Sequence, residues 1–175
     1  MTKKTMDLFD NAKGIRLDIG CGENKQPGGF LGMDKLDLPG VDIVHDMETF
    51  PWPIPDNSVN SAIASHVLEH IDPAHGTFLK FMDEVWRILK PGCHFFFAVP
   101  YAGSPGYWQD PTHCNGITER TLWYFDPMAV GGALYGFYRP KPWKIVQSNW
   151  VATGNLEAVF EKRPIDKSYG IKETK

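Results

Sequence analysis

Two glycines and two aspartates within the first 46 residues have the types and spacing that chemistry on a bound ligand requires. Gly20 and Gly22 follow the short apolar run 15–19, which predicts a buried strand leading directly into a tight turn. Glycine has no side chain and tolerates positive φ, so a ligand can lie against the backbone there. Successive N–H groups of such a turn form a concavity suited to a carboxylate or a phosphate.

Asp34 and Asp46 stand at the ends of the next two predicted strands, 30–34 and 41–46. In an open parallel sheet the carboxyl ends of the strands face one crevice, at the point where the strand order reverses. A carboxylate after the second strand can accept hydrogen bonds from both hydroxyls of a ribose. One after the third strand can accept from an exocyclic amino group such as that of adenine. Together these residues predict a nucleoside ligand with a polar tail near the glycine turn.

A dinucleotide would fit the same outline, but two features of the sequence speak against it. Lys25 occupies the position where a pyrophosphate-binding turn has its third glycine. The segment 23–29 contains Pro27, Gly28 and Gly29, so no well-formed helix follows the turn to supply a dipole for a diphosphate. A nicotinamide-dependent oxidoreductase on a related sheet nevertheless stays as an alternative.

The elements that position these residues alternate along the chain. Apolar runs predict strands at 15–19, 30–34, 41–46, 59–65, 95–99, 143–151 and 156–160, the last two joined by a turn at 154–155. A helix is predicted from Asp72-Pro73 to the Pro91-Gly92 stop, and a second helix begins at Thr118. The apolar stripe of the first helix comprises Phe78, Phe81, Met82, Val85, Trp86 and Leu89. This order predicts an α/β sheet, mostly parallel, that ends in an antiparallel pair.

Composition narrows the class of protein. The 175 residues are most simply one domain with a substantial core. A net charge of −3 and a pI near 6.0 favour neither a nucleic-acid groove nor an anionic membrane surface. Three cysteines without framework spacing, and no long apolar stretch, predict a soluble cytoplasmic protein with reduced thiols.

Five segments in order resemble the motifs of class I S-adenosylmethionine-dependent methyltransferases, particularly the small type 11 group. These segments are 17–22, 32–34, 41–47, 65–71 and 84–92, so the resemblance covers roughly residues 15–100. It implies a three-layer, Rossmann-like α/β fold with a mostly parallel seven-stranded sheet whose last strand is antiparallel. It also implies S-adenosylmethionine as methyl donor. Because the spacing from Asp18 to Asp34 is short, the first helix is expected to be abbreviated or replaced by a loop.

The resemblance assigns roles along a single domain, 1–175, in which 15–100 is the cofactor-binding half. It implies that Gly20 and Gly22 pack against the methionine portion of the cofactor, that Asp34 holds the ribose hydroxyls and that Asp46 takes the adenine amino group. Ser65 or His66 is expected to meet the methionine amino end. The full set of expected cofactor-binding residues is Asp18, Gly20, Cys21, Gly22, Asp34, Lys35, Asp46, Met47, Ser65 and His66.

The acceptor side is assigned to the aromatic, Gly/Pro-rich segment 101–142, which precedes the final strand pair (143–162) and a polar tail (163–175). A sulfonium is already an activated electrophile, so the enzyme mainly aligns donor and acceptor, with a base where the acceptor must lose a proton. The catalytic candidates are His66, His113 and Asp110. The expected pocket walls are Tyr107, Trp108, Trp123 and Tyr124. The alternative is that His113 and Asp110 only fix an irregular loop and that the aromatic side chains are core.

Other classes fit less well. A zinc site from Cys114, His113, His66 and His70 is conceivable, but Cys114 has no Cys-x-x-Cys partner, so no metal is predicted. The segment 102–106 lacks the first glycine of a serine-hydrolase nucleophile elbow. A small-molecule acceptor is favoured because no basic stripe appears. Besides the oxidoreductase, a non-catalytic protein that uses the same crevice to bind cofactor or a partner remains an alternative.

Overall fold

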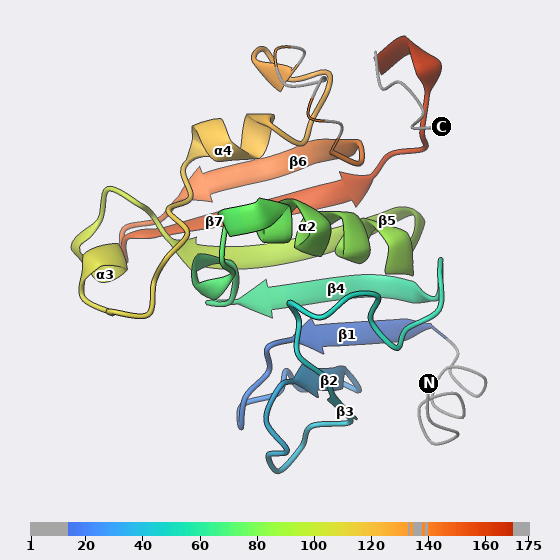
Figure 1. The fold of residues 1–175 in the computed structure, drawn as a ribbon, viewed down its shortest axis with the longest axis vertical. Helices are drawn as coiled ribbons and strands as arrows, with labels where there is room; N and C mark the ends of the chain where they lie inside the picture. Colours follow the sequence, from blue (N-terminus) through green and yellow to red (C-terminus); the bar gives the residue numbers. More distant parts are fainter. Residues whose placement is uncertain (1–13, 133, 135–137, 139, 170–175) are drawn as a thin grey trace.

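A computed structural model describes residues 14–132, 134, 138 and 140–169. Its centre is a seven-stranded sheet in the order β3-β2-β1-β4-β5-β7-β6 (Figure 1). The strands are β1 (Ile15–Ile19), β2 (Leu31–Asp34), β3 (Ile43–Val44), β4 (Val59–Ser65), β5 (Leu89–Pro100), β6 (Trp143–Trp150) and β7 (Asn155–Lys162). Neighbouring strands from β3 to β5 pair in parallel, whereas β7 is antiparallel to both β5 and β6. The predicted α/β fold, with a mostly parallel seven-stranded sheet whose last strand is antiparallel, is therefore confirmed.

The switch point of the sheet lies between β1 and β4. Their register pairs Ile19 with Ala64, so both strands reach their carboxyl ends at the same height. From β1 the chain continues outward to β2, and from β4 it continues to β5 on the other side. A ligand crevice is expected at this divergence, outside the carboxyl ends of the two strands.

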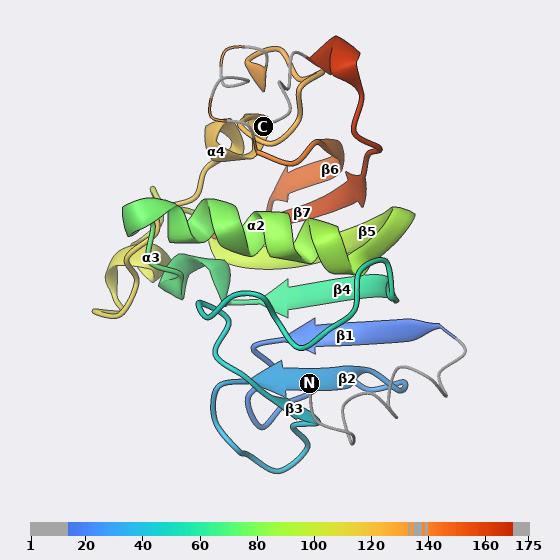
Figure 2. The ribbon, with the colours of Figure 1, turned by 45° about the vertical axis from the view of Figure 1, so that its right-hand side comes forward.

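One face of the sheet is covered by α2 (Thr77–Ile88), which runs along β4 and β5 (Figures 1 and 2). Its buried stripe meets the inward side chains of the strands; the fully buried members include Leu17, Met33, Ala62, Phe81, Val85, Phe95 and Phe160. The short helices α3 (Pro105–Trp108) and α4 (Glu119–Trp123) follow β5. Among the described residues no helix covers the opposite face, so the second helical layer of the expected three-layer arrangement is not found there.

Several element boundaries differ from the sequence-based prediction. The long helix begins at Thr77 rather than at Asp72, because Asp72 Oδ1 accepts the Ala74 N–H (2.8 Å) and the intervening 74–76 form a separate 3₁₀ turn, η2 (Ala74–Gly76). The helix ends at Ile88, and Leu89 already belongs to β5. The third strand retains only two of its six predicted residues. Thr118 does begin a helix as predicted, and its N–H donates to Thr121 Oγ1 (3.1 Å).

No helix forms between β1 and β2. The chain from 20 to 30 instead makes a turn and an irregular loop. This confirms the expectation that the short spacing replaces the first helix by a loop.

Asp83 on α2 gives a pH-dependent prediction for stability. Its carboxyl accepts the Lys141 N–H (2.9 Å), and burial raises its pKa to about 6. The ordinary pKa of this carboxyl is 3.8, so between pH 3.8 and about 6 the folded state keeps a proton that the unfolded state has lost. The protonated Asp83 side chain therefore stabilises the fold at low pH. This stabilisation is lost as the pH rises to 6. Asp83→Asn keeps the acceptor and is expected to stabilise the protein at pH 7 by about 2–3 kcal/mol.

The measurement is urea unfolding of wild type and Asp83→Asn between pH 4 and 7. The advantage of the variant should shrink as pH falls from 6 to 4. Asp37→Asn, at an exposed carboxylate, is the matched control and should match wild type throughout. A pH-independent difference for Asp83→Asn would contradict the assignment.

Candidate active site

The turn after β1 presents backbone without side chains at the switch point. Gly20 has φ +68° and its N–H donates to the Met33 carbonyl (2.7 Å). A Cβ built on Gly20 would lie only 2.5 Å from Cγ2 of Val67, which follows β4. The turn therefore sits directly against the segment after β4, and only glycine fits this position.

Asp34, the last residue of β2, is tied to this turn. Its side chain is buried (9% exposed), and Oδ2 accepts the Gly22 N–H (2.9 Å) while Oδ1 accepts the Leu36 N–H (3.0 Å). A carboxylate oxygen has two acceptor positions, so each oxygen can take a further hydrogen bond from a ligand. Asp34 is thus held rigidly while retaining the capacity to bind hydroxyl groups.

Asp18 braces the loop that replaces the first helix. Its Oδ2 accepts the Gln26 N–H (2.7 Å), and burial raises the pKa of its carboxyl above the ordinary value in spite of that bond. Cys21 packs over β2, where a Cβ on Gly32 would lie 2.6 Å from its Sγ. Burial raises the pKa of the Cys21 thiol to about 11. Asp18 and Cys21 therefore support the turn and the loop that follows it, and neither residue lines the cavity described next.

A cavity of about 200 Å³ opens at these strand ends. Six of its lining residues are predicted cofactor-binding residues: Gly20, Asp34, Lys35, Asp46, Met47 and His66. The other four were not assigned a cofactor role from the sequence: Glu48, Val67, His70 and Ile71. The two aspartates thus share one cavity, as the strand-end argument requires.

The segment after β3 has a defined shape at the cavity rim. Asp46 Oδ1 accepts the Glu48 N–H (3.0 Å), and the Trp52 indole N–H donates to the Met47 carbonyl (3.0 Å). The cavity lining has three acidic side chains, Asp34, Asp46 and Glu48, and one lysine, Lys35. This balance favours a ligand that carries positive charge.

His66 directly follows β4 and has φ +56°, a conformation that is uncommon for a residue other than glycine. Its N–H donates to the Ala98 carbonyl (2.8 Å), which holds this backbone in place. The side chain is 48% exposed, with Nδ1 3.2 Å from Glu69 Oε1 and Nε2 3.3 Å from Asn155 Nδ2. The imidazole therefore lies between a buried carboxylate and the open cavity.

Glu69 was given no role in the sequence analysis. It lies in the 3₁₀ turn η1 (Leu68–His70) with its side chain 1% exposed, and burial raises the pKa of its carboxyl, an effect that the nearby histidines partly offset. Neither carboxylate oxygen has a hydrogen-bond partner among the described residues. The sequence signal that could have identified Glu69 is a glutamate close to the apolar residues 67, 68 and 71, with His66 and His70 on either side.

His113 reaches the same carboxylate from a distant loop. Its side chain is 7% exposed, and Nε2 lies 4.0 Å from Glu69 Oε1 and 3.8 Å from Asp110 Oδ2. Asp110 is held in a local turn, where Oδ1 accepts the Thr112 N–H (2.8 Å) and hydroxyl (2.7 Å). These two bonds lower the pKa of Asp110. The structure thus brings His66 and His113 together around Glu69, although His113 and Asp110 do not line the cavity.

The four aromatic residues expected as pocket walls do not line this cavity either. The Tyr107 ring lies 5.5 Å from that of His113, whereas the Trp108 side chain is 76% exposed. Trp123 lies under the Arg120 guanidinium (4.3 Å), and Tyr124 packs against Phe125 (5.8 Å between ring centroids). Within the segment 101–142, residues 133, 135–137 and 139 lie outside the described part of the chain, as do 170–175 of the tail.

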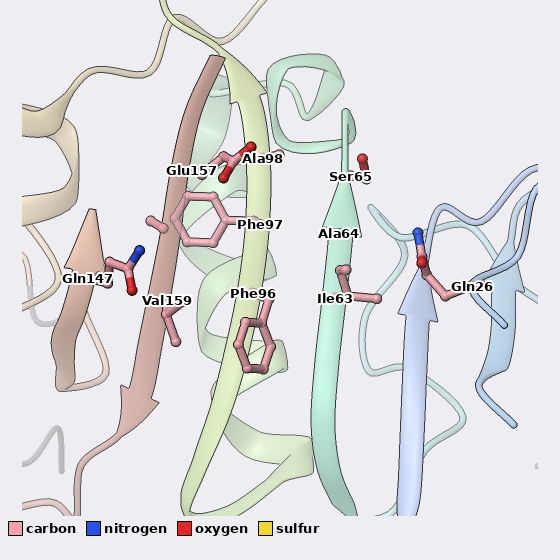
Figure 3. A pocket seen from close by; sticks show the side chains of 11 residues that line it. Gln26, Ile63, Ala64, Ser65, Phe96, Phe97, Ala98, Gln147, Glu157 and Val159 are labelled. Carbon is pink, nitrogen blue, oxygen red and sulfur yellow. The ribbon is translucent and has the colours of Figure 1, made fainter. Parts of the chain in front are cut away.

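A second hollow of about 250 Å³ lies on the sheet face opposite α2 (Figure 3). Ser65 is found here with Gln26, and the floor carries Ile63, Phe96 and Val159. Glu157 is the only acidic side chain of its lining. Because it lacks the glycine turn and both aspartates, this hollow is a weaker candidate than the cavity at the strand ends.

Comparisons with known proteins support the fold. A family profile described as "Methyltransferase domain" matches residues 29–97. No curated protein matches the sequence. The structure resembles a SAM-dependent methyltransferase from Archaeoglobus fulgidus, with 15% identity, 90% of this chain and 89% of the other covered, and a TM-score of 0.60.

Two further solved structures have the same fold. One is a 16S rRNA (adenine(1408)-N(1))-methyltransferase from Catenulisporales acidiphilia, with 14% identity, 93% and 91% coverage of this chain and that one, and a TM-score of 0.59. The other is from a complex between the Haloferax volcanii Trm112 methyltransferase activator and a methyltransferase, with 14% identity, 92% and 89% coverage, and a TM-score of 0.57.

Fold and site define an α/β protein with a cavity at the switch point that Asp34 and Asp46 both line. The methyltransferase-domain profile matches 69 of the 175 residues, and the solved structures show that the fold is similar to that of S-adenosylmethionine-dependent methyltransferases. Among the described residues no helix has both the length and the apolar character needed to cross a membrane.

Proposed function

We propose that this protein transfers the methyl group of S-adenosylmethionine, bound in the cavity at the strand ends, to a small-molecule acceptor. The observation that carries the proposal is the Asp34 carboxylate, which is fixed by the Gly22 and Leu36 N–H groups and lines the same cavity as Asp46. A dual acceptor at the second strand end matches a ribose diol. The acidic lining also suits the positively charged sulfonium.

In this proposal the ribose lies on Asp34, the adenine lies beside Asp46 and Met47, and the methionine tail lies over the glycine turn. The cavity volume of about 200 Å³ is below the roughly 300–1,000 Å³ of most ligand pockets. In the proposal it holds the nucleoside, and the reactive end of the cofactor lies at its opening, beside His66. That opening is where an acceptor would enter.

We further propose that His66 is the base for an acceptor that must lose a proton. Glu69 Oε1 lies 3.2 Å from Nδ1, so the ion pair can hold the ring orientation, and Nε2 would accept the acceptor's proton in exchange for its 3.3 Å contact with Asn155 Nδ2. Of the three catalytic candidates, only His66 lines the cavity. His113 and Asp110 support it from behind, because His113 faces Glu69 and Asp110 shapes the loop that carries His113.

A small-molecule acceptor is supported by the acidic pI near 6.0, which gives no electrostatic attraction to nucleic acid. Similar folds occur in an rRNA methyltransferase and in a methyltransferase complexed with a protein activator, so an RNA substrate or a partner protein would be informative outcomes of a screen. The three cysteines are free thiols, which fits a reducing compartment such as the cytoplasm.

The first test of the proposal is ligand-induced thermal stabilisation. S-adenosylhomocysteine at 100 times its Kd is expected to stabilise the fold by about 2.7 kcal/mol, or a Tm shift of about 5–10 °C. NAD at the same concentration should leave Tm unchanged, because the turn lacks a diphosphate site. The reverse result would favour the oxidoreductase alternative.

The second test is turnover, measured as S-adenosylhomocysteine released with a panel of phenolic, amine and carboxylate acceptors and with RNA. With the acceptor so identified, His66→Gln should lower kcat about 100-fold while the Kd for S-adenosylhomocysteine changes less than threefold. Cofactor binding without turnover against any acceptor would instead favour a non-catalytic protein. A normal kcat in His66→Gln would remove this residue from the mechanism.

A further inference from the structure

The Glu69 carboxylate is the most unusual buried group in the described part of the chain. Its side chain is 1% exposed, and neither oxygen accepts a hydrogen bond from a described residue. A buried charged carboxylate without donors is costly, so native proteins nearly always pair such groups. The nearest cationic candidates are imidazole nitrogens of His66 and His113 at 3.2 and 4.0 Å, and the latter is too far for a hydrogen bond. Glu69 therefore has one close imidazole partner, and the acceptor capacity of its oxygens is not filled by any described group.

Glu69, His70 and His113 together have the arrangement of a ligand set. Each offers one ligand atom, and these three atoms lie within 4.8 Å of one another. The His70 and His113 rings meet edge to face, with centroids 4.8 Å apart. We call these three residues the Glu69–His70–His113 cluster.

Hydrogen bonds outside the cluster fix which nitrogen each histidine has free. His113 Nδ1 lies 2.7 Å from the Tyr107 carbonyl, which can only accept, so Nδ1 carries the proton and Nε2 has the lone pair. The Thr112 hydroxyl donates to Asp110, so it accepts from His70 Nδ1–H (3.0 Å), and Nε2 of His70 is free in the same way. Metal-binding histidines characteristically donate their second ring N–H to such partners.

Main-chain hydrogen bonds hold the two halves of the cluster together across more than 40 residues. The N–H groups of Cys114 and Asn115 both donate to the Glu69 carbonyl (2.9 and 3.0 Å), and the Asn115 side chain donates to the Leu68 carbonyl (2.9 Å). The loop that carries His113 is therefore fastened to the turn that carries Glu69 and His70. Such fastening limits the reorganisation that binding would require.

We infer that the Glu69–His70–His113 cluster binds one divalent transition-metal ion of the zinc class. Two imidazole nitrogens and one carboxylate oxygen are a donor set that Zn²⁺ accepts, with a further position left for water or another ligand. Ligand atoms around one zinc ion lie roughly 3.3 Å apart, so atoms that now lie up to 4.8 Å apart would approach by up to about 1.5 Å on binding. The cation would supply the positive charge that the Glu69 carboxylate lacks.

The position of the cluster next to the cofactor cavity suggests a role for the bound ion. His70 lines the cofactor cavity as well as belonging to the cluster, so the open coordination position would lie beside the space proposed for the acceptor. An acceptor hydroxyl or carboxylate oxygen is the chemical class that such a position binds. Cys114 has no Cys-x-x-Cys partner in the sequence, so it does not by itself predict a zinc site. The three-dimensional set uses Glu69 instead of the cysteine.

The test is metal titration of chelator-treated protein with Zn²⁺ by calorimetry and with Co²⁺ by visible absorption. We expect one ion per chain and Co²⁺ bands of a low-symmetry nitrogen/oxygen site. Glu69→Gln and His70→Ala should each weaken Zn²⁺ binding on the order of 100-fold, and Thr112→Val about 10-fold. His70 is exposed, so its alanine variant keeps the inference testable if Glu69→Gln fails to fold.

His94→Ala is the matched control, because His94 also lies near a carboxylate, 3.7 Å from Glu161, but far along β5 from the cluster. It should bind Zn²⁺ like wild type. Wild-type affinity in both Glu69→Gln and His70→Ala, or loss of binding in His94→Ala alone, would overturn the inference. The inference does not rest on methyl transfer: S-adenosylhomocysteine binding by metal-free protein, with no uptake of Zn²⁺, would refute the metal site and leave the cofactor site intact.

Discussion

Asp34→Ala is expected to weaken binding of S-adenosylhomocysteine about 100-fold. The proposed ribose contact comprises two hydrogen bonds to a charged carboxylate, each contributing about 1.5 kcal/mol or more. Their loss costs about 3 kcal/mol, and each 1.4 kcal/mol corresponds to a factor of ten in Kd. The variant also leaves the Gly22 and Leu36 N–H groups without their acceptor, which loosens the turn under the cofactor. Calorimetric titration with S-adenosylhomocysteine measures the change.

Two controls make this result specific. Asp37→Ala removes an exposed carboxylate from the loop that follows Asp34 and should bind the ligand as wild type does. Circular dichroism and thermal unfolding show whether Asp34→Ala is folded at the temperature of the titration. A folded Asp34→Ala with unchanged affinity would refute the ribose assignment and, with it, the proposed position of the cofactor.

Gly20→Ala is expected to destabilise the fold by about 3 kcal/mol, the largest stability effect we predict for a single added methyl group. A left-handed conformation costs a residue with a Cβ about 1–2 kcal/mol. The new Cβ would also lie 2.5 Å from Val67 Cγ2 in a packed region, and overpacking costs about 1–3 kcal/mol. Urea unfolding at pH 7 measures the sum. Because the turn must shift to relieve the contact, cofactor affinity should fall as well.

Gly22→Ala is the matched comparison, because Gly22 shares the positive φ (+51°) but a Cβ there would meet no described atom within 4 Å. It should cost only the conformational part, about 1–2 kcal/mol. The double variant Gly20→Ala/Val67→Ala should recover part of the loss, and the double-mutant cycle isolates the contact between the two positions. Equal destabilisation by Gly20→Ala and Gly22→Ala, with no coupling to Val67, would show that close packing does not require a glycine at position 20.

These expectations separate the cofactor site from the acceptor chemistry. In the proposal, Asp34 and Gly20 hold the nucleoside, whereas His66 lies where an acceptor would react and the buried Glu69 lies beside His66 without lining the cavity. A fold does not determine the substrate, and similar folds serve differing acceptors. For this reason the turnover screen, and not the cofactor titration, decides between an enzyme and a non-catalytic cofactor-binding protein.

Boundaries of elements were the least predictable part of the fold. The apolar stripe of α2 was predicted correctly from Phe78 to Val85, because helical periodicity is a local property of the sequence. Its start was predicted five residues too early, because Asp72 can cap a turn or a helix equally well. Leu89 continues the apolar pattern but lies in β5, where pairing with Val59 of β4 determines its conformation.

The amino-acid sequence alone determined where most strands lie along the chain, the glycine turn without a helix behind it, and the two aspartates at neighbouring strand ends. Each of these follows from short-range patterns: apolar runs, turn-forming residues and strand ends that must share one edge of a parallel sheet. Only the tertiary structure decided that Glu69 is buried without a donor, that His113 lies beside it, and that Trp123 and Tyr124 lie away from the cavity. The first two facts depend on contacts between residues more than 40 positions apart, such as Glu69 and His113, and all three depend on how distant segments pack, which no local pattern encodes.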